Sequence, residues 1–201
     1  MEKKKRQALF SKIYEENSWG SDESRSGSGS TLDETERLRL AIPELLENFQ
    51  IRSILDIPCG DFNWMKHTDL TGVHYVGADI VPKMIDSNKL FYSSEDREFK
   101  VLDVLTDDLP KVDMVMCRDL FVHMTFADAM KALENITTSG AKYLMATTFT
   151  LHDNEELGEG MWRPLDMMKE PFNFPMPIVM LNEGNPHPYF CDKAIGVWSI
   201  A

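Results

Sequence analysis

The spacing of apolar residues along the chain changes near residue 50. Upstream, apolar side chains recur at helical spacing, which predicts a charged amphipathic helix over residues 2–16. A second helix is predicted to end at about Phe49, and Thr31 with Glu34 three residues later fits a capping box at its start. A polar stretch, residues 21–30, separates the two. The first fifty residues are therefore expected to form two helices joined by a polar connection.

Beyond residue 50 the apolar residues gather in short runs that end in loops. The runs that predict the first strands are 53–57, 73–80, 99–102, 112–117 and 141–147. Helical stretches alternate with them, one of which covers residues 125–136. Two last runs, 178–181 and 194–200, predict a hairpin that adds an antiparallel edge strand. This order predicts an α/β fold with a mostly parallel seven-stranded sheet and helices on both faces.

Two segments depart from this alternation. Residues 150–177 are irregular and rich in proline and glycine, and a long irregular stretch in a compact domain is usually a functional loop. The run from Ser26 to Ser30 has the composition of a flexible linker. Trp19 and Arg25 are costly residues to leave on a linker, so a loop that closes over a ligand is an equal alternative.

Composition and charge exclude several classes of function. The chain of 201 residues is 43% hydrophobic, enough for the core of one domain. It carries 33 acidic against 21 basic residues, a net charge of −12, which disfavours nucleic acids and anionic membranes as partners. The three widely spaced cysteines fit neither a disulfide framework nor a zinc site. Reduced thiols point to a cytoplasm, that of the host if the chain is viral.

Acidic residues close three of the predicted strands. Asp56, Asp79 and Asp103 each stand where a strand meets its loop, and ligands of open α/β sheets bind at the carboxyl ends of strands. Asp79 follows the Gly60 turn by about 20 residues, the position that accepts hydrogen bonds from ribose. That turn lacks the glycines of a dinucleotide site, and Asp61 at the expected helix start would repel a pyrophosphate. These features favour a nucleoside without phosphates, such as S-adenosylmethionine (SAM). A single Asp would be better explained as a helix cap or turn residue, but three in register with the strands favour a ligand.

These motifs together resemble those of the class I SAM-dependent methyltransferases over about residues 50–150. The matching segments are Ile54–Asp61, Tyr75–Ile80, Leu102–Val104 and Val112–Asp119. One departure is Pro58-Cys59, where the family usually has Gly-x-Gly. The whole chain further resembles small methyltransferases of glycan-synthesis loci in bacteria and large DNA viruses. The segments that carry this narrower likeness are Trp19-Gly20, Ser26–Thr31, Trp162–Pro164 and Pro171-Phe172.

The resemblance implies a Rossmann-like methyltransferase domain with SAM as cofactor and S-adenosylhomocysteine as product. Its parts would be an N-terminal lid (1–50), a SAM-binding core (51–149), an acceptor loop (150–177) and a C-terminal hairpin (178–201). By family position, Asp79 would bind the ribose and Asp103 the adenine amino group. With the residues expected from the polar stretch, the predicted cofactor contacts are Trp19, Arg25, Ser28, Asp56, Gly60, Asp79, Ile80, Asp103, Val104 and Arg118.

The acceptor is expected to be a small molecule, most simply a sugar hydroxyl such as that of rhamnose, within a larger glycan-synthesis protein. A hydroxyl is a poor nucleophile, so a general base is needed, and the candidates are Asp119, His123 and His152. Trp162, Arg163 and Phe172 are expected to bind the acceptor. We expect no metal. The alternatives are another small acceptor such as a carboxylate or phenol, a nicotinamide-dependent oxidoreductase, and a binding module without turnover.

Overall fold

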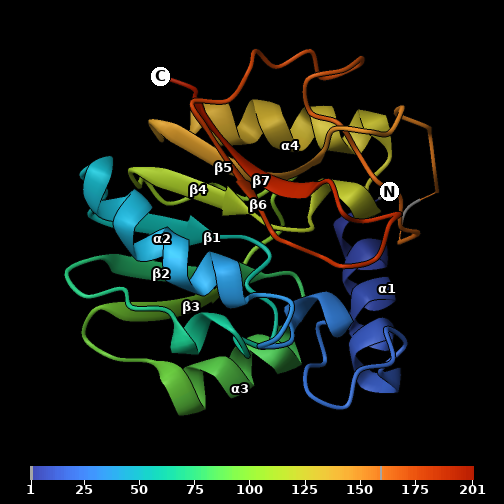
Figure 1. The fold of residues 1–201 in the computed structure, drawn as a ribbon. Coiled ribbons are helices and arrows are strands. Elements are labelled where there is room, and N and C mark those ends of the chain that lie inside the picture. Colours follow the sequence, from blue (N-terminus) through green and yellow to red (C-terminus); the bar gives the residue numbers. More distant parts are fainter. Residues whose placement is uncertain (1, 159) are drawn as a thin grey trace.

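One sheet organises the computed structural model, which describes residues 2–158 and 160–201. Among these residues seven strands lie in the order β3-β2-β1-β4-β5-β7-β6 (Figure 1). Their bounds are β1 Ser53–Asp56, β2 His74–Asp79, β3 Arg97–Val101, β4 Met114–Cys117, β5 Tyr143–Phe149, β6 Val179–Asn182 and β7 Lys193–Ser199. Residues 1 and 159, within the predicted lid and the predicted acceptor loop, lie outside the described residues.

The predicted fold class is confirmed, with one change at the edge of the sheet. Strands β1 to β5 are mutually parallel, and β7 pairs antiparallel with both β5 and β6. The antiparallel strand is therefore one position inside the edge, and β6 is the edge strand. Consecutive side chains of a strand point to opposite faces. Ile54 accordingly packs in one apolar cluster and Leu55 in the other.

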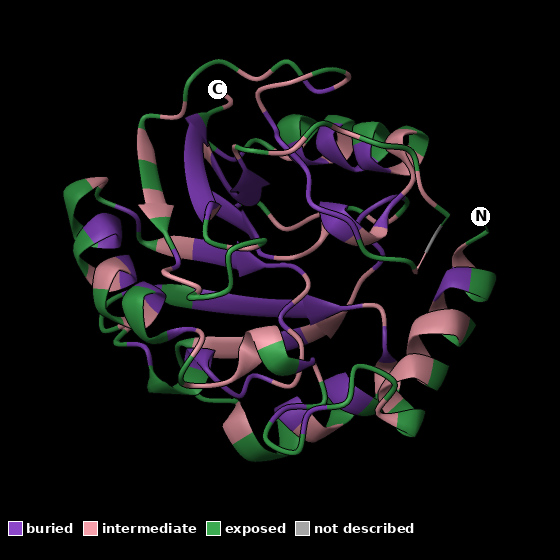
Figure 2. Cartoon of the chain, turned by 45° about the vertical axis from the view of Figure 1, so that its right-hand side comes forward, coloured by how far each residue is buried: buried purple, intermediate pink, exposed green. Residues whose placement is uncertain are grey.

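Helices cover both faces of the sheet. The α-helices of the described residues are α1 Lys3–Glu16, α2 Glu36–Asn48, α3 Pro82–Tyr92 and α4 Phe126–Thr138. Helices α2 and α3 supply Leu38, Ile42 and Ile85 to the cluster on one face, whereas α4 supplies Leu133 and Ile136 to the cluster on the other. Figure 2 shows the buried sheet between helices whose outer surfaces are exposed. Helix α1 stands apart from both layers, across the carboxyl ends of the strands (Figure 1).

The predicted alternation of strand and helix is wrong at two connections. Residues 57–73, all described, join β1 to β2 through turns and a short 3-10 helix, Met65–His67. Gly60, Phe62 and Gly72 there have φ angles of 58°, 60° and 76°, a left-handed backbone that an α-helix does not tolerate. Residues 102–113 likewise join β3 to β4 through turns. Asp61 therefore lies in a turn and not at the start of a helix.

The predicted capping box at Thr31 is confirmed only in part, because it lies one turn ahead of the helix. The Thr31 hydroxyl accepts the Glu34 backbone N–H at 3.4 Å. Helix α2 begins at Glu36 with Thr35 as its N-cap residue. The Thr35 hydroxyl donates to the Thr31 carbonyl at 2.7 Å, and this bond closes a turn ahead of the helix. Thr125, by contrast, caps α4 by accepting from the backbone N–H of Asp128 at 3.1 Å.

Candidate active site

A cavity of about 390 Å³ opens at the carboxyl edge of the sheet, a volume typical of small-molecule sites. Asp56 and Asp79 line it from the ends of β1 and β2, and Asp103 lines it from the loop after β3. Asp119, just past β4, lines its other end. The parallel strands thus bring together the four aspartates that the sequence places at strand ends.

Two of these carboxylates are buried, and for both of them burial outweighs the hydrogen bonds that they accept. Asp79 accepts the Val81 backbone N–H at 3.0 Å, and burial raises its pKa to about 6 against the opposing effect of that bond and of two further backbone N–H groups. Asp56 accepts the Tyr75 hydroxyl at 2.5 Å, and burial raises its pKa to about 7. A buried carboxylate is costly unless donors or positive charge surround it. This end of the cavity therefore favours a ligand that carries hydroxyl donors or positive charge.

The polar stretch at residues 21–30 is hydrogen-bonded to the turn that follows β1. The Asp61 carboxylate accepts the Ser24 hydroxyl at 2.9 Å and the Arg25 backbone N–H at 2.7 Å. The Ser26 hydroxyl in turn accepts the Asp61 backbone N–H at 2.9 Å. Any Cβ at Gly60 would stand 2.3 Å from the Ser26 hydroxyl oxygen, so glycine is required for this approach. The stretch is thus part of the site wall, and its closing as a lid remains a prediction.

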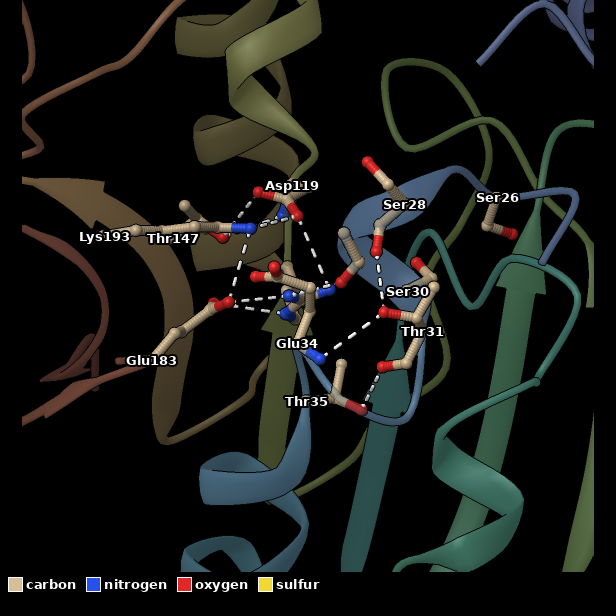
Figure 3. A network of polar contacts seen from close by, with 12 residues as sticks. Ser26, Ser28, Ser30, Thr31, Glu34, Thr35, Asp119, Thr147, Glu183 and Lys193 are labelled. Carbon is tan, nitrogen blue, oxygen red and sulfur yellow. Dashed lines mark hydrogen bonds and ion pairs between the residues drawn. The ribbon is translucent and has the colours of Figure 1, made fainter. Parts of the chain in front are cut away.

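Four charged side chains form a network at the other end of the cavity (Figure 3). Arg118 donates to both carboxylate oxygens of Glu183, at 3.1 and 2.6 Å, and to the Gly29 carbonyl at 2.8 Å. Lys193 lies 2.6 Å from Asp119 and 3.3 Å from Glu183. Two cations and two anions balance, as buried charges require.

Asp119 is held in this network in an unusual backbone conformation. Its φ is 54°, and its backbone N–H donates to the Thr147 hydroxyl at 2.8 Å. Burial opposes its ionisation, but the attraction of Lys193 and Arg118 prevails and lowers the pKa of Asp119 to about 2. Asp119 is therefore a fixed anion at neutral pH and a weak proton acceptor.

His123 lines the same end of the cavity and has a defined tautomer. Its Nδ1 lies 3.0 Å from the Met161 carbonyl oxygen, which can only accept, so Nδ1 carries the hydrogen and Nε2 keeps its lone pair. Burial lowers the pKa of His123 below 6.5, against the opposing hydrogen bond to Met161. Trp19 stacks beside the imidazole at 5.4 Å between ring centroids. A neutral imidazole in this position is suited to accept a proton.

This architecture is similar to that of solved methyltransferase structures. No family model and no curated protein matches the sequence. Among solved structures, a putative methyltransferase from Thermobifida fusca YX superposes with a TM-score of 0.63 at 14% identity, over 94% of this chain and 86% of its own. The methyltransferase domain of bacterial CtHen1 gives 0.61 at 11% identity, over 82% and 98%. Magnesium protoporphyrin IX methyltransferase from Synechocystis PCC 6803, solved with SAM bound, gives 0.60 at 12% identity, over 97% and 95%.

The chain has the class I methyltransferase fold. Its sheet order and its antiparallel β7 are those of the Rossmann-like methyltransferase fold. At such identities the likeness concerns the fold alone, so the chemistry rests on the residues of the cavity.

Most predicted site residues lie around one cavity of this methyltransferase fold. The predicted residues that line it are Trp19, Ser28, Asp56, Gly60, Asp79, Ile80, Asp103, Val104, Arg118, Asp119, His123 and Trp162. Arg25, His152, Arg163 and Phe172 fall outside the set of described residues that line the cavity. Arg25 is exposed and meets Asp61 through its backbone N–H, which does not require an arginine side chain.

Three of the residues outside the cavity hold loops or fill the core. Arg163 is 4% exposed and donates to the Glu155 carbonyl, and its guanidinium lies over the Phe126 ring. Phe172 is buried and meets the same ring edge-on at 5.9 Å. His152 lies against Tyr189 and 3.5 Å from Asp192. Their neighbours account for the positions of Arg163, Phe172 and His152, so acceptor binding by the first two and catalysis by His152 stay predictions without support from the cavity.

Sequence reasoning missed several residues of the cavity. Lys193 and Glu183 complete the charge network, and Asn185 and Phe190 reach the cavity from the loop between β6 and β7. Arg6 reaches it from α1. Their sequence neighbourhoods carry no catalytic motif, and Lys193 stands out only as a cation at the start of a strand.

Replacing Phe172 with alanine should destabilise the protein without weakening cofactor binding. The side chain is 7% exposed and belongs to the apolar cluster beneath α4, so truncation leaves a cavity. We expect a loss of about 3 kcal/mol in the free energy of unfolding, measured by urea titration. Met176→Ala, at a side chain that is 77% exposed, is the matched control and should change little. A raised KM for the acceptor at unchanged stability would instead support the predicted role of Phe172 in acceptor binding.

The remaining features concern metal binding and membrane crossing. Among the described residues, no group of three or more His, Cys, Asp or Glu side chains is arranged to hold a metal ion. Within residues 2–158 and 160–201, no helix combines the length and apolarity that a membrane crossing requires.

Proposed function

We propose that this protein is a SAM-dependent methyltransferase that methylates a hydroxyl of a small acceptor. One observation carries the proposal: a single cavity joins buried aspartates at the ends of β1 and β2 to a neutral histidine past β4. The first end suits a cationic nucleoside, and the second suits proton removal from an acceptor.

The chemistry of the cavity fits SAM better than a nicotinamide dinucleotide. SAM carries a positive sulfonium and ribose hydroxyl donors, whereas a dinucleotide brings a negative pyrophosphate next to buried Asp56 and Asp79. Asp79 would hold the ribose, with Ile80 and Val104 beside the base and Gly60 and Ser28 at the methionine end. When bound, SAM supplies an electrophilic methyl group. Arg118 is already engaged by Glu183 and Gly29, so its role is to position the network.

His123 and Asp119, which both follow β4, have different roles in the proposed acid–base chemistry. His123 Nε2 takes the proton of the acceptor hydroxyl, because Nδ1 is fixed by Met161 and the ring is neutral at pH 7. Asp119 stays ionised and can accept a hydrogen bond from the acceptor or stabilise the imidazolium. The hydroxyl oxygen is thereby made nucleophilic where the methyl group is presented.

A sugar is the acceptor that the cavity walls favour. Trp19 and Trp162 offer aromatic faces, and Glu34 and Asn185, joined at 2.7 Å, offer polar groups at the same end. Sugars bind through this combination of ring faces and hydroxyl partners. Together with the likeness to glycan-locus enzymes, this supports a sugar such as rhamnose as acceptor. We place the reaction in a cytoplasm, within a larger glycan-synthesis protein, without a nucleic acid or membrane partner.

Calorimetry and turnover test the proposal directly. SAM and S-adenosylhomocysteine should bind the protein, and NAD should not. Screening SAM turnover against nucleotide sugars and oligosaccharides should then yield a methylated product. Binding of NAD in place of SAM would overturn the cofactor, whereas SAM binding with methylation of phenols or carboxylates alone would overturn the acceptor class.

Replacing Asp79 with alanine should weaken SAM binding. The change removes a buried acceptor from the ribose hydroxyls, with an expected loss of about 1–3 kcal/mol in binding free energy, measured by calorimetry. Asp86→Ala, at an exposed carboxylate of α3, is the matched control and should bind SAM as the unaltered protein does. Equal affinity for both variants would remove Asp79 from the ribose role.

A further inference from the structure

Helix α1 turns one stripe of side chains toward the cavity. Arg6, Phe10 and Tyr14 all line it, and their spacing of four residues places them on one face of the helix. The helix is otherwise highly charged, and Arg6 is its one buried residue among those described. A polar helix of 14 residues has little stability of its own in water. Its position therefore depends on contacts with the rest of the chain.

Those contacts fix α1 over the loops that follow β2 and β3. Gln7 donates to the Ile80 carbonyl at 3.1 Å, and Lys3 pairs with Asp107. Arg6 donates to Asp103 at 2.6 Å, with side chains that are 5% and 2% exposed. Such a buried pair contributes little net stability after desolvation, but it fixes geometry.

The ion pair with Arg6 also uses part of the hydrogen-bonding capacity of Asp103. Besides Arg6, its carboxylate accepts the Leu105 backbone N–H at 3.1 Å and the Thr106 hydroxyl at 3.1 Å. A carboxylate has about four lone-pair sites. Asp103 is thus largely committed to holding α1 and its own turn, which leaves it little capacity for the adenine amino group.

The sheet side of this part of the cavity is apolar. Ile80 and Val81 line it from the link between β2 and α3, and Met84 lines it from α3 itself. Leu102 and Val104 line it from the loop after β3. Phe10 and Tyr14 are half-buried on the α1 side. Two apolar walls next to Asp79 suit a flat purine, because aromatic side chains stack on the face of a base.

We propose that α1 forms the outer wall of the adenosine subsite. Phe10 and Tyr14 pack on the purine, and Arg6 is a positioning residue that holds this wall through Asp103. The inference rests on the proposed function, because it takes SAM as the ligand. The proposal gives α1, which precedes the motif-bearing residues 50–150, a role in recognising adenosine.

Calorimetry with two probes tests this wall on the full chain. S-adenosylhomocysteine and 5′-methylthioadenosine share the adenosine group, so Phe10→Ala and Tyr14→Ala should each weaken both by about tenfold. Lys12→Ala, on the same helix with a side chain that is 71% exposed, is the matched control and should leave both affinities unchanged. Unchanged affinities in both aromatic variants would overturn the proposal. An unaltered protein that fails to bind either probe would instead overturn the proposed function.

Hydrogen exchange supplies a readout that needs no variant. Adding S-adenosylhomocysteine should slow amide exchange across Lys3–Glu16, because the ligand would bridge α1 to the sheet. Arg6→Met should weaken that protection while the strands exchange as before. Slowed exchange at the strand ends with none in α1 would show that the nucleoside does not contact this helix.

Discussion

Replacing His123 with asparagine should lower kcat by about 100-fold while SAM affinity stays unchanged. The asparagine amide can still donate to the Met161 carbonyl that His123 Nδ1 contacts at 3.0 Å, but it cannot take a proton. The experiment needs an acceptor found in the turnover screen, initial rates at saturating acceptor, and calorimetry with SAM. His67→Asn, outside the cavity, is the matched control and should keep full activity.

The pH profile separates proton transfer from packing. Burial lowers the pKa of His123, so the unaltered enzyme should lose kcat as pH falls through a midpoint below 6.5, where the imidazole becomes protonated. Asp119 cannot produce this limb, because its pKa of about 2 lies far below it. Asp56 and Asp79, with pKa values of about 7 and about 6, do titrate in this range, so kcat is measured at saturating SAM and the limb is assigned by comparison with the variant. His123→Asn should abolish the limb. If the variant kept the same limb, a group other than His123 would be the one that accepts the proton of the acceptor hydroxyl.

The sequence was sufficient to predict that Asp56 and Asp79 meet at one end of the cavity. Asp56 and Asp79 close apolar runs, and in a parallel sheet the ends of neighbouring strands meet at one edge. The order of those runs likewise predicted the sheet, because buried parallel strands are apolar throughout. The missing helices between β1 and β2 and between β3 and β4 were not predictable from this period. Left-handed residues such as Phe62 decide the first of these connections, and the sequence pattern does not show their backbone angles.

The end of the cavity that we propose for the acceptor depends on contacts between distant parts of the chain. Glu183 stands 65 residues from Arg118, and Lys193 stands 74 residues from Asp119. Neither pair has a local spacing that predicts its meeting. Arg163 and Phe172 have side chains suited to a sugar, yet the path of residues 150–177 turns both toward α4. Residue type therefore indicated candidate chemistry, and tertiary packing decides which of these residues line the cavity.

Replacing Glu183 with alanine should lower the free energy of unfolding by about 3 kcal/mol, measured by urea titration at pH 7. Glu183 and Asp119 balance Arg118 and Lys193, and the Arg118 and Glu183 side chains are 4% and 2% exposed. Removing Glu183 leaves two cations beside one anion, and the side chains of those cations, Arg118 and Lys193, are only 4% and 11% exposed. Glu98→Ala provides the control, because its pair with Lys100 at 2.8 Å is about 40% exposed and should contribute less than about 1 kcal/mol.

The same substitution should disturb the active site at temperatures where the variant is folded. Glu183 pairs with both Arg118 and Lys193. Arg118 donates to the Gly29 carbonyl and Lys193 pairs with Asp119, so losing Glu183 should loosen both of these contacts at the cavity. Glu183→Gln keeps the shape and a hydrogen-bond acceptor but removes the charge, and it should fall between the alanine variant and the unaltered protein in stability. If both variants unfold at the same urea concentration as the unaltered protein, the charge balance is not what holds this end of the site together.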